Sequence, residues 1–280
     1  MQNAIPRYKT LFFEQTRLEQ KSNHTDPGFN ANQPVIPIKD ENPQLRTPYI
    51  TYALIATNVA VWFLLQNAGF GPRFEASLCA YGLVPGNVFL DSWAREAAQG
   101  FCATKDGLGW SGVLSSMFMH GSWMHILGNM WFLYIFGDNV EDAMGPLRFL
   151  AFYLLSGLVA ALAQIYSDLH SLIPMVGASG AIGGVMGGYI ALYPKVRVHL
   201  LLIFIVIFTT IRVPAWVMLG YWVALQIFGG LSSIGSAGQG GVAFWAHLGG
   251  FAAGIGLSFV LKDNKLLRRH PYYGWSSRRH

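Results

Sequence analysis

Long apolar runs without a single acidic residue constrain this chain more than any other feature of its sequence. Six runs approach the roughly 17–25 residues that a helix needs to cross a bilayer core of about 30 Å. They are residues 50–69, 122–137, 147–166, 177–193, 214–230 and 242–261. Only 12% of the 280 residues are charged, against roughly 25% in ordinary soluble domains. These features exclude a water-soluble enzyme and a nucleic-acid binder with a broad basic face. They predict an all-α polytopic protein in the lipid bilayer.

A seventh apolar run, residues 198–211, lies between the fourth and fifth of these segments, and Arg197 and Arg212 bracket it. Runs of about 10–14 residues are often interfacial or re-entrant rather than membrane-spanning. β-branched and aromatic residues dominate this one, so its periodicity does not distinguish a helix from a strand. We therefore expect 198–211 to be a re-entrant or interfacial segment between two spans.

The basic residues predict the topology, because positively charged loops stay in the cytoplasm. Those after Val260 are Lys262, Lys265, Arg268, Arg269, Arg278 and Arg279. Lys195 and Arg197 follow the fourth run and are expected on the same side. Six spans then place both termini in the cytoplasm and the 70–115 loop outside, in a multi-pass protein of a plasma or inner membrane.

Three regions follow from this topology. They are residues 1–48, a cytoplasmic extension with an irregular proline-containing lead-in, 49–262, the membrane domain, and 263–280, a basic cytoplasmic tail. Residues 1–33 contain no recognisable signal peptide and no motif that indicates a role. Cys79 and Cys102 both fall in the outer loop, where an oxidising compartment permits a disulfide. The sequence leaves open whether these two cysteines pair.

Ser179 lies at the start of the fourth run, in the string Gly177-Ala178-Ser179-Gly180. Small residues at i, i+4 spacing let membrane helices pack closely, and on that interpretation Ser179 is merely small. Alternatively, the unpaired N–H groups and the dipole of a helix N-terminus favour developing negative charge, which suits a nucleophile. A G-x-S-G string by itself is weak support for catalysis, so the packing interpretation holds until a base is found.

His247, followed by Gly249 and Gly250 in the last run, supplies such a base. A neutral, buried imidazole is the kind of proton acceptor that a serine nucleophile needs. The alternative is a histidine bonded to a backbone carbonyl in a seam of small residues. No acidic residue lies in any predicted span, so we expect a dyad of Ser179 and His247 rather than a triad.

His125 and Asn129 are four residues apart and therefore share one helix face. Both can donate hydrogen bonds, which suits an oxyanion hole completed by the Ser179 backbone N–H; the alternative is hydrogen bonding between helices. His120, five residues before His125, points elsewhere on a helix, and we expect it to orient the outer loop. The two histidines have neither the spacing nor the glutamate of a zinc-protease motif, and we expect no metal and no other cofactor.

A reaction between Ser179 and His247 requires both side chains at the same depth in the membrane. Each lies near the start of its run, so the two helices must run in the same direction, with an odd number of spans between them. The run 214–230 supplies one span. If 198–211 also crossed, the two side chains would be separated by most of a core of about 30 Å. This geometry independently argues that 198–211 does not span.

In this combination the residues resemble the rhomboid intramembrane serine proteases, over residues 34–262. Four motifs carry the resemblance, in the order that the family has them. They are His120-x4-His125-x3-Asn129; Gly137, Glu141, Gly145, Phe149 and Tyr153 at four-residue spacing; Gly177-Ala178-Ser179-Gly180; and Ala246-His247-x2-Gly250-x3-Gly254. The resemblance implies a six-helix rhomboid-like bundle with a membrane-embedded outer loop. It also implies hydrolysis of peptide bonds in or next to the transmembrane segments of membrane proteins.

The resemblance also implies roles for individual residues. Ser179 looks like the nucleophile, His247 like the general base, and His125 and Asn129 like oxyanion donors. The residues expected to support the site structurally are His120, Gly177, Gly180, Glu141, Gly250 and Gly254. Two departures stand out. Some relatives have an aromatic residue four positions after the serine that stacks on the catalytic histidine, where this chain has Gly183. Some have Trp-Arg in the outer loop, where it has Trp110-Ser111.

Transmembrane substrate proteins and the lipid bilayer are the expected partners, nucleic acid is not, and the sequence does not indicate an oligomeric state. Two other functions are alternatives to proteolysis. A non-catalytic member of the same fold would have lost the serine or the histidine, and both are present. A small transporter or channel would have paired charges or broken helices along a path, and the predicted spans contain no acid.

The predicted topology places both ends of 198–211 on the cytoplasmic side. Cysteines introduced one at a time as Arg197→Cys and Arg212→Cys should react with a membrane-impermeant maleimide from the same side, and Arg73→Cys from the opposite side. Modification of positions 197 and 212 from opposite sides would contradict the six-span arrangement.

Overall fold

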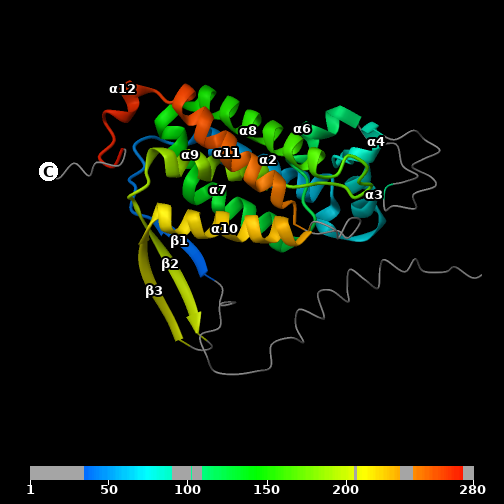
Figure 1. Cartoon of the computed structure of the whole chain (residues 1–280), viewed down its shortest axis with the longest axis horizontal. Coiled ribbons are helices and arrows are strands. Elements are labelled where there is room, and N and C mark those ends of the chain that lie inside the picture. The colour runs from blue at the N-terminus through cyan, green and yellow to red at the C-terminus, as the bar shows by residue number, and fades with distance from the viewer. Residues whose placement is uncertain (1–34, 90–101, 103–108, 205–206, 234–241, 274–280) are drawn as a thin grey trace, which may run out of the picture.

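The computed structural model describes residues 35–89, 102, 109–204, 207–233 and 242–273 of the chain (Figure 1). The predicted extension 1–33, part of the outer loop and the last seven residues of the basic tail lie outside the described residues. Within them, six long helices pack side by side into a bundle. They are α2 (Tyr49–Leu64), α7 (Trp123–Met144), α8 (Pro146–Ser167), α9 (Ser179–Leu192), α10 (Ala215–Ser233) and α11 (Phe244–Leu261).

Each of these helices coincides with one predicted run, so the prediction of where the apolar helices lie is confirmed. Short helices cover the two ends of the bundle (Figure 1). Those at the end where α9 begins are η1 (Asn67–Gly69), α3 (Gly71–Tyr81), α4 (Pro85–Phe89), η2 (Gly109–Ser111) and α6 (Gly112–Ser116). The helix α12 (Asn264–Leu267) lies at the opposite end.

Three of the described helices, α8, α10 and α11, are long and apolar enough to cross a membrane, whereas α2 and α9 are apolar but shorter. Helix α9 has 14 residues, 11 of them buried, and at 1.5 Å per residue it is only about 21 Å long. Because protein rather than lipid surrounds it, α9 does not need the length of a lipid-facing span. The prediction of six membrane crossings stays a prediction.

Helices α9 and α11 touch backbone to backbone. A Cβ atom built on Gly250 would lie 1.9 Å from the Gly180 carbonyl oxygen, and one built on Gly254 would lie 1.9 Å from the Gly184 carbonyl oxygen. Only glycine fits at such a contact. Residue numbers rise together along the two helices, so α9 and α11 run in the same direction, as the sequence predicts.

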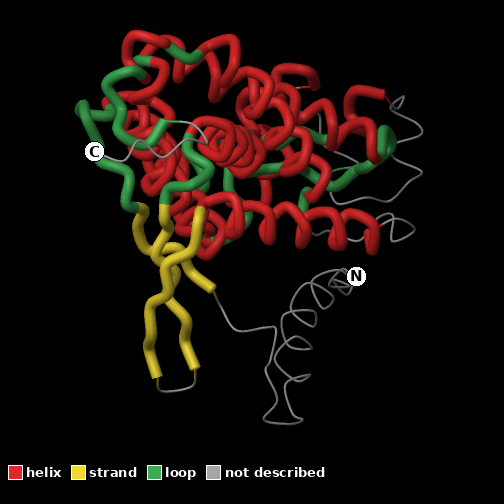
Figure 2. The backbone as a smooth tube through the Cα atoms, turned by 60° about the vertical axis from the view of Figure 1, so that its left-hand side comes forward, coloured by secondary structure: helices red, strands yellow, loops and turns green. Residues whose placement is uncertain are grey.

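The prediction of an all-α protein is wrong for the run 198–211. This run forms a β-hairpin of β2 (Arg197–Phe204) and β3 (Ile207–Pro214) rather than a helical segment. Its predicted re-entrant or interfacial position in the membrane stays a prediction. Arg197 pairs with Pro214 in the antiparallel register, so the run begins and ends at the same place. The hairpin projects sideways from the end of the bundle where α9 finishes (Figure 2). The abundance of β-branched and aromatic residues explains the strands.

The lead-in to the first helix, predicted to be irregular, contains the strand β1 (Val35–Asp40), which pairs with β2 and completes a three-stranded antiparallel sheet. Pro37 is compatible with this strand because β1 lies at the edge of the sheet, where a missing N–H costs no ladder bond. The register shifts between Pro37 and Lys39. The Pro37 carbonyl accepts a hydrogen bond from the Trp131 indole at 2.6 Å, which ties the sheet to α7.

A second correction concerns α7, which continues past the predicted end at residue 137 to Met144. Its last two turns contain Asp138, Glu141 and Asp142, so this helix does carry acidic residues. They lie at the end of the bundle remote from Ser179, close to the sheet and α12.

The outer segment is held by a disulfide between Cys79 and Cys102, whose sulfur atoms are joined. This observation answers the question that the sequence leaves open. Cys79 belongs to α3, so the bond fixes Cys102 to the short helices at the site end of the bundle.

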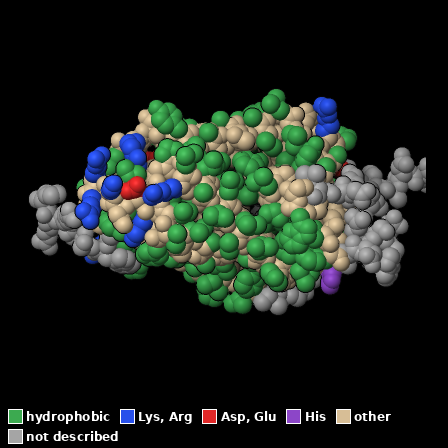
Figure 3. Space-filling model, turned by 90° about the horizontal axis from the view of Figure 1, so that it is seen from above, with side chains coloured by type: hydrophobic (Ala, Val, Ile, Leu, Met, Phe, Trp, Pro, Cys, Tyr) green, Lys and Arg blue, Asp and Glu red, His purple; other side chains and the backbone are tan. Residues whose placement is uncertain are grey.

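The face of the bundle seen in Figure 3 is covered largely by apolar side chains, and Lys and Arg gather at the end that carries α12. Exposed basic residues there include Lys265, Arg268 and Arg269. An apolar girdle with basic residues at one end is the surface expected of a protein that lies in a bilayer with that end in the cytoplasm.

The α9–α11 contact predicts a contrast between two glycines of α11. Gly254→Ala should lower the stability of the purified protein by about 1–3 kcal/mol, because the new methyl group meets a backbone carbonyl that cannot move aside. The control is Gly256→Ala, where a Cβ atom has nothing within 4 Å. It should leave stability unchanged or raise it by up to about 1 kcal/mol. Thermal unfolding in detergent measures both, and equal effects would contradict this packing.

Candidate functional site

Ser179 is the first residue of α9, and the turn before it depends on glycine. Gly177 has φ 131°, a conformation that residues with a Cβ atom rarely adopt. A Cβ atom on Gly177 would also lie 2.7 Å from Cε1 and Nε2 of His125 and 3.4 Å from the Ser179 hydroxyl oxygen. The imidazole of His125 and the hydroxyl of Ser179 therefore border the same small volume at the start of α9.

His247 lies in the first turn of α11, at the same end of the bundle as Ser179. Gly180, next to Ser179, packs against Ala246, next to His247. Ser179 and His247 therefore start two parallel helices at the same level. Ser179 and His247 are both partly buried residues and not members of the fully buried core.

The surroundings of the His247 ring come from α10 rather than α9. A Cβ atom on Gly183 would lie 2.9 Å from the His247 carbonyl oxygen, so a large side chain does not fit at this position. On the other side, the Trp222 ring lies 5.7 Å from the His247 ring, centroid to centroid. Gln226 Oε1 lies 2.7 Å from His247 Nδ1.

His125 is held with its Nε2 toward Ser179. The Gly121 backbone N–H donates a hydrogen bond to His125 Nδ1 at 3.4 Å, so in the neutral ring the proton belongs on Nε2. One turn further, Asn129 is only 8% exposed, and its Nδ2 has no hydrogen-bond partner among the described residues. A buried donor without an acceptor is costly and calls for an explanation.

His120 is fully buried and packs edge-to-face on His125, with ring centroids 5.2 Å apart. Gln66 holds its backbone through two hydrogen bonds, of 2.8 Å to the N–H and 2.7 Å to the carbonyl. Gln66 lies next to η1, so these bonds tie the turn at His120 to the end of α2. They involve the backbone of His120, and the role predicted for its side chain, orienting the outer loop, stays a prediction.

A small cavity opens beside Ser179, with a volume of about 20 Å³, room for about one water molecule. Its walls are mostly small residues, among them Gly157, Ala160, Gly177 and Ala246. Within the part of the chain that the structure describes, no group of three or more His, Cys, Asp or Glu side chains could hold a metal ion.

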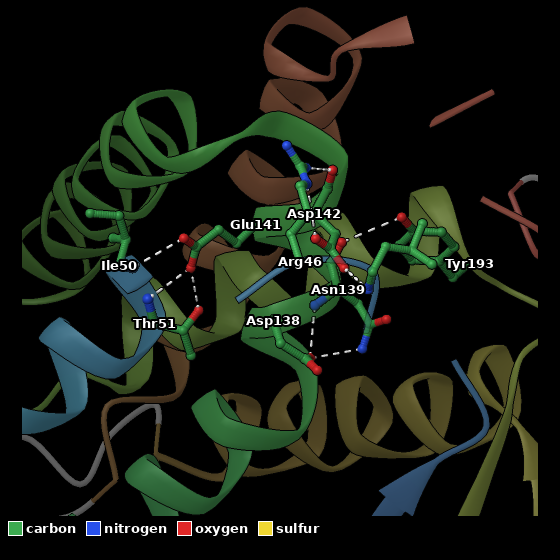
Figure 4. Close-up of polar contacts among 9 residues, drawn as sticks. Arg46, Ile50, Thr51, Asp138, Asn139, Glu141, Asp142 and Tyr193 are labelled. Atoms are coloured by element: carbon green, nitrogen blue, oxygen red, sulfur yellow. Dashed lines mark hydrogen bonds and ion pairs between the residues drawn. The ribbon is translucent and has the colours of Figure 1, made fainter. Parts of the chain in front are cut away.

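Glu141, predicted to support the site, lies at the other end of the bundle, in the last turn of α7. Its carboxylate accepts hydrogen bonds from the backbone N–H groups of Ile50 and Thr51, at 3.0 and 2.8 Å, and from the Thr51 hydroxyl at 2.8 Å (Figure 4). Glu141 therefore caps the N-terminus of α2 from α7. It does not touch Ser179 or His247, so any support that it gives to the site acts through the position of α2.

Two neighbouring carboxylates attach the chain before α2 to the same end of α7. Asp142 accepts hydrogen bonds from the Leu45 backbone N–H at 2.7 Å and from the Arg46 guanidinium at 3.3 Å. Asp40 of β1 accepts a hydrogen bond from the Tyr189 hydroxyl of α9. Burial raises the pKa of the Asp40 carboxyl to about 6, and the bond from Tyr189 opposes part of that rise.

Sequence reasoning missed three glutamines that hold this site. Gln226 contacts the His247 ring, Gln164 of α8 accepts a hydrogen bond from the Ala246 backbone N–H at 3.2 Å, and Gln66 holds His120. The signal was present for all three, because each is an uncharged polar residue inside an apolar run, where polar groups are costly and often functional.

Comparison with known proteins places the chain among relatives of one kind. The sequence model of the rhomboid domain matches residues 108–264. The rhomboid protease AarA of Providencia stuartii is 30% identical over 234 residues, 78% of this chain and 74% of the relative. The mitochondrial Rhomboid protein 1 of Saccharomyces cerevisiae is 31% identical over 211 residues, 74% of this chain and 51% of the relative. RHOMBOID-like protein 4 of Arabidopsis thaliana is 34% identical over 172 residues, 61% of this chain and 37% of the relative. The chain thus spans about half the length, or less, of the yeast and plant relatives.

The cap that Glu141 provides predicts a loss of stability without a change at Ser179. Glu141→Gln replaces one acceptor oxygen by an amino group that faces N–H donors, so the free energy of unfolding should fall by about 1–3 kcal/mol. Unfolding in detergent is the measurement, and equal stabilities of wild type and Glu141→Gln would contradict the capping role.

Proposed function

The chain belongs to the rhomboid family, and from this we propose that it is an intramembrane serine endopeptidase. It cleaves peptide bonds in or next to the transmembrane segments of membrane proteins, and the residues that react are Ser179 and His247. The observation that carries the proposal is the arrangement at the starts of α9 and α11. Two parallel helices begin there with a hydroxyl and an imidazole at one level, and His125 and Asn129 contribute hydrogen-bond donors beside them.

The first half of the reaction forms an acyl-enzyme. The Ser179 hydroxyl gives its proton to Nε2 of His247 while its oxygen attacks the carbonyl carbon of the scissile bond. The resulting oxyanion is stabilised by the His125 Nε2–H, the Asn129 amide and the backbone N–H groups at the start of α9. Asn129 Nδ2, which has no partner in the described structure, acquires one in the oxyanion. His247 then returns its proton to the leaving amine.

The second half releases the acyl group. A water molecule gives a proton to His247 and attacks the ester carbon, and the tetrahedral intermediate collapses with return of the proton to Ser179. The cavity beside Ser179 is large enough for one water molecule, and the start of α9 lies at an end of the bundle rather than at its middle. Both features let water reach Ser179, which the surrounding lipid would otherwise exclude.

A helical substrate hides its peptide groups in internal hydrogen bonds, so it must unwind before it reaches Ser179. Glycine or proline near the scissile bond lowers the cost of unwinding. The small residues around the cavity leave room for only a small side chain beside the scissile bond. The substrates are therefore single membrane spans with small and helix-breaking residues near the end of the span that faces the site.

The orientation that we propose places both termini, α12 and the sheet in the cytoplasm of a plasma or inner membrane, with Ser179 near the outer face. The gathering of basic side chains around α12 supports it. The membrane domain at 49–262 carries the reaction, and the extension 1–48 and the tail 263–280 flank it.

Reactivity of Ser179 tests the proposal. A fluorophosphonate probe should label the purified wild-type protein in detergent and in liposomes, and labelling should vanish in Ser179→Ala. It should fall at least about 100-fold in His247→Ala. The matched control is Ser258→Ala, a buried serine at the far end of α11, which should be labelled like wild type.

The same set is then assayed for cleavage of a single-span substrate with glycine next to the scissile bond. Equal labelling of wild type and Ser179→Ala would exclude the nucleophile, and no cleavage by labelled protein would favour a non-catalytic member of the fold.

A further inference from the structure

The His247 ring makes one hydrogen bond that its own helix does not provide. Gln226 Oε1, on α10, lies 2.7 Å from His247 Nδ1. Gln226 is only 8% exposed and belongs to a helix that is otherwise almost entirely apolar. A buried amide in such a helix is retained only where its hydrogen bonds are satisfied.

The second hydrogen bond of Gln226 decides which amide atom faces the histidine. Gln226 Nε2 donates to the Trp222 backbone carbonyl at 3.3 Å. A carbonyl oxygen can only accept, so the atom beside it must be the amide nitrogen, and the amide oxygen faces His247. That oxygen in turn needs a donor. The proton of the neutral His247 ring therefore lies on Nδ1, and Nε2 is left with a free lone pair.

We infer that Gln226 is a positioning residue for His247. Its amide oxygen accepts the Nδ1–H, holds the imidazole in the tautomer that has a basic Nε2, and fixes the rotation of the ring. The inference rests on the proposed function, since Nε2 is the atom that takes the Ser179 proton. During that transfer the ring becomes an imidazolium, and the bond to Gln226 strengthens because its donor is then charged.

Gln226 and Trp222 together replace a support that α9 does not offer. Gly183 leaves no room for a side chain between α9 and the His247 backbone. The Trp222 ring lies tilted by 36° beside the imidazole at 5.7 Å, one turn of α10 before Gln226. Two residues of α10 thus hold the His247 ring. Trp222 packs beside the ring, and Gln226 bonds to its Nδ1 atom.

The remaining neighbours of His247 do not hold its Nδ1 atom. Among the described residues, the titratable side chain that interacts electrostatically with the His247 ring is His125 of α7. Gln164 of α8 bonds to the backbone of α11 at Ala246 and not to the ring. A neutral amide at Nδ1 selects the tautomer as a carboxylate would, but it stabilises the imidazolium less than a carboxylate does.

The test combines kinetics with the state of the ring itself. Gln226→Met keeps the length of the side chain and removes the acceptor. It should lower kcat by about 10- to 100-fold with KM unchanged. In protein labelled with ¹⁵N-histidine, the His247 signals, assigned from His247→Ala, should show a proton on Nδ1 in wild type. Gln226→Met should shift them toward the Nε2–H tautomer.

Gln226→Glu is the conservative rescue. Its carboxylate also accepts from Nδ1, so kcat should return to within a few-fold of wild type. The acid limb of the pH profile of kcat should move to higher pH, because the carboxylate stabilises the imidazolium. Gln164→Met is the matched control, since it makes the same change one helix away. It should lower thermal stability without moving the His247 signals or the pH profile.

Three results would overturn the inference. The first is an Nε2–H tautomer in the wild-type protein, which needs no variant to fold. The second is a Gln226→Met protein whose kcat and His247 signals are unchanged. The third is a loss of activity in Gln226→Met that Gln226→Glu neither rescues nor converts into a shifted pH profile, because a merely structural role gives that pattern. If wild type is neither labelled nor active, the proposed function fails, whereas the tautomer measurement still decides whether Gln226 sets the state of the ring.

Discussion

The close approach of α9 to α11 is the contact on which the rest of the molecule depends. In lipid, helices gain nothing from hiding apolar surface from water, and their association rests on tight packing of small residues and on polar contacts. Here glycines of each helix lie against backbone carbonyls of the other, at distances that exclude any side chain and allow weak Cα–H···O contacts. The register of this contact determines that Ser179 and His247 start at the same level. The chemistry of the site is thus a consequence of the packing of its two helices.

The two histidines of the site differ in role because different groups bond to their Nδ1 atoms. At His125 the partner is the Gly121 backbone N–H, which leaves a proton on Nε2 and makes that atom a donor. At His247 the partner is the Gln226 amide oxygen, which leaves Nε2 as an acceptor. An oxyanion needs a hydrogen-bond donor, which His125 provides, and the serine hydroxyl needs a proton acceptor, which His247 provides. The same type of side chain thus serves both roles. The deciding atoms are neutral, which suits a site where an unpaired charge would be costly.

The two ends of the bundle are stabilised in different ways. Around Ser179 the residues are small, the cavity is small, and polar groups are few. At the other end, the carboxylates of Glu141 and Asp142 bind backbone N–H groups and Arg46, and the sheet joins there through Trp131. The hydrogen bonds of this second end order the chain that leads into α2. At the end that holds the site, the hydrogen bond that the structure shows on the His247 ring comes from a neutral amide rather than from a carboxylate.

The sequence by itself determined the helices, because each follows from the residues of its own apolar run. Apolar length places all six long helices, although α7 continues seven residues past its predicted end. The serine and histidine at the starts of two helices, with glycines around, were enough to identify a candidate site. The run 198–211 was set apart from the six long helices, but its strands were not predicted, since a short apolar run has the same pattern in a strand and in a helix. The paired strand β1 was missed because its partner lies about 160 residues away. Only the tertiary structure decided that Gln226 meets His247, that Asn129 Nδ2 has no partner among the described residues, and that Glu141 caps α2. Each of these contacts depends on how far one helix is rotated and shifted against another, and that depends on all of the packed side chains at once.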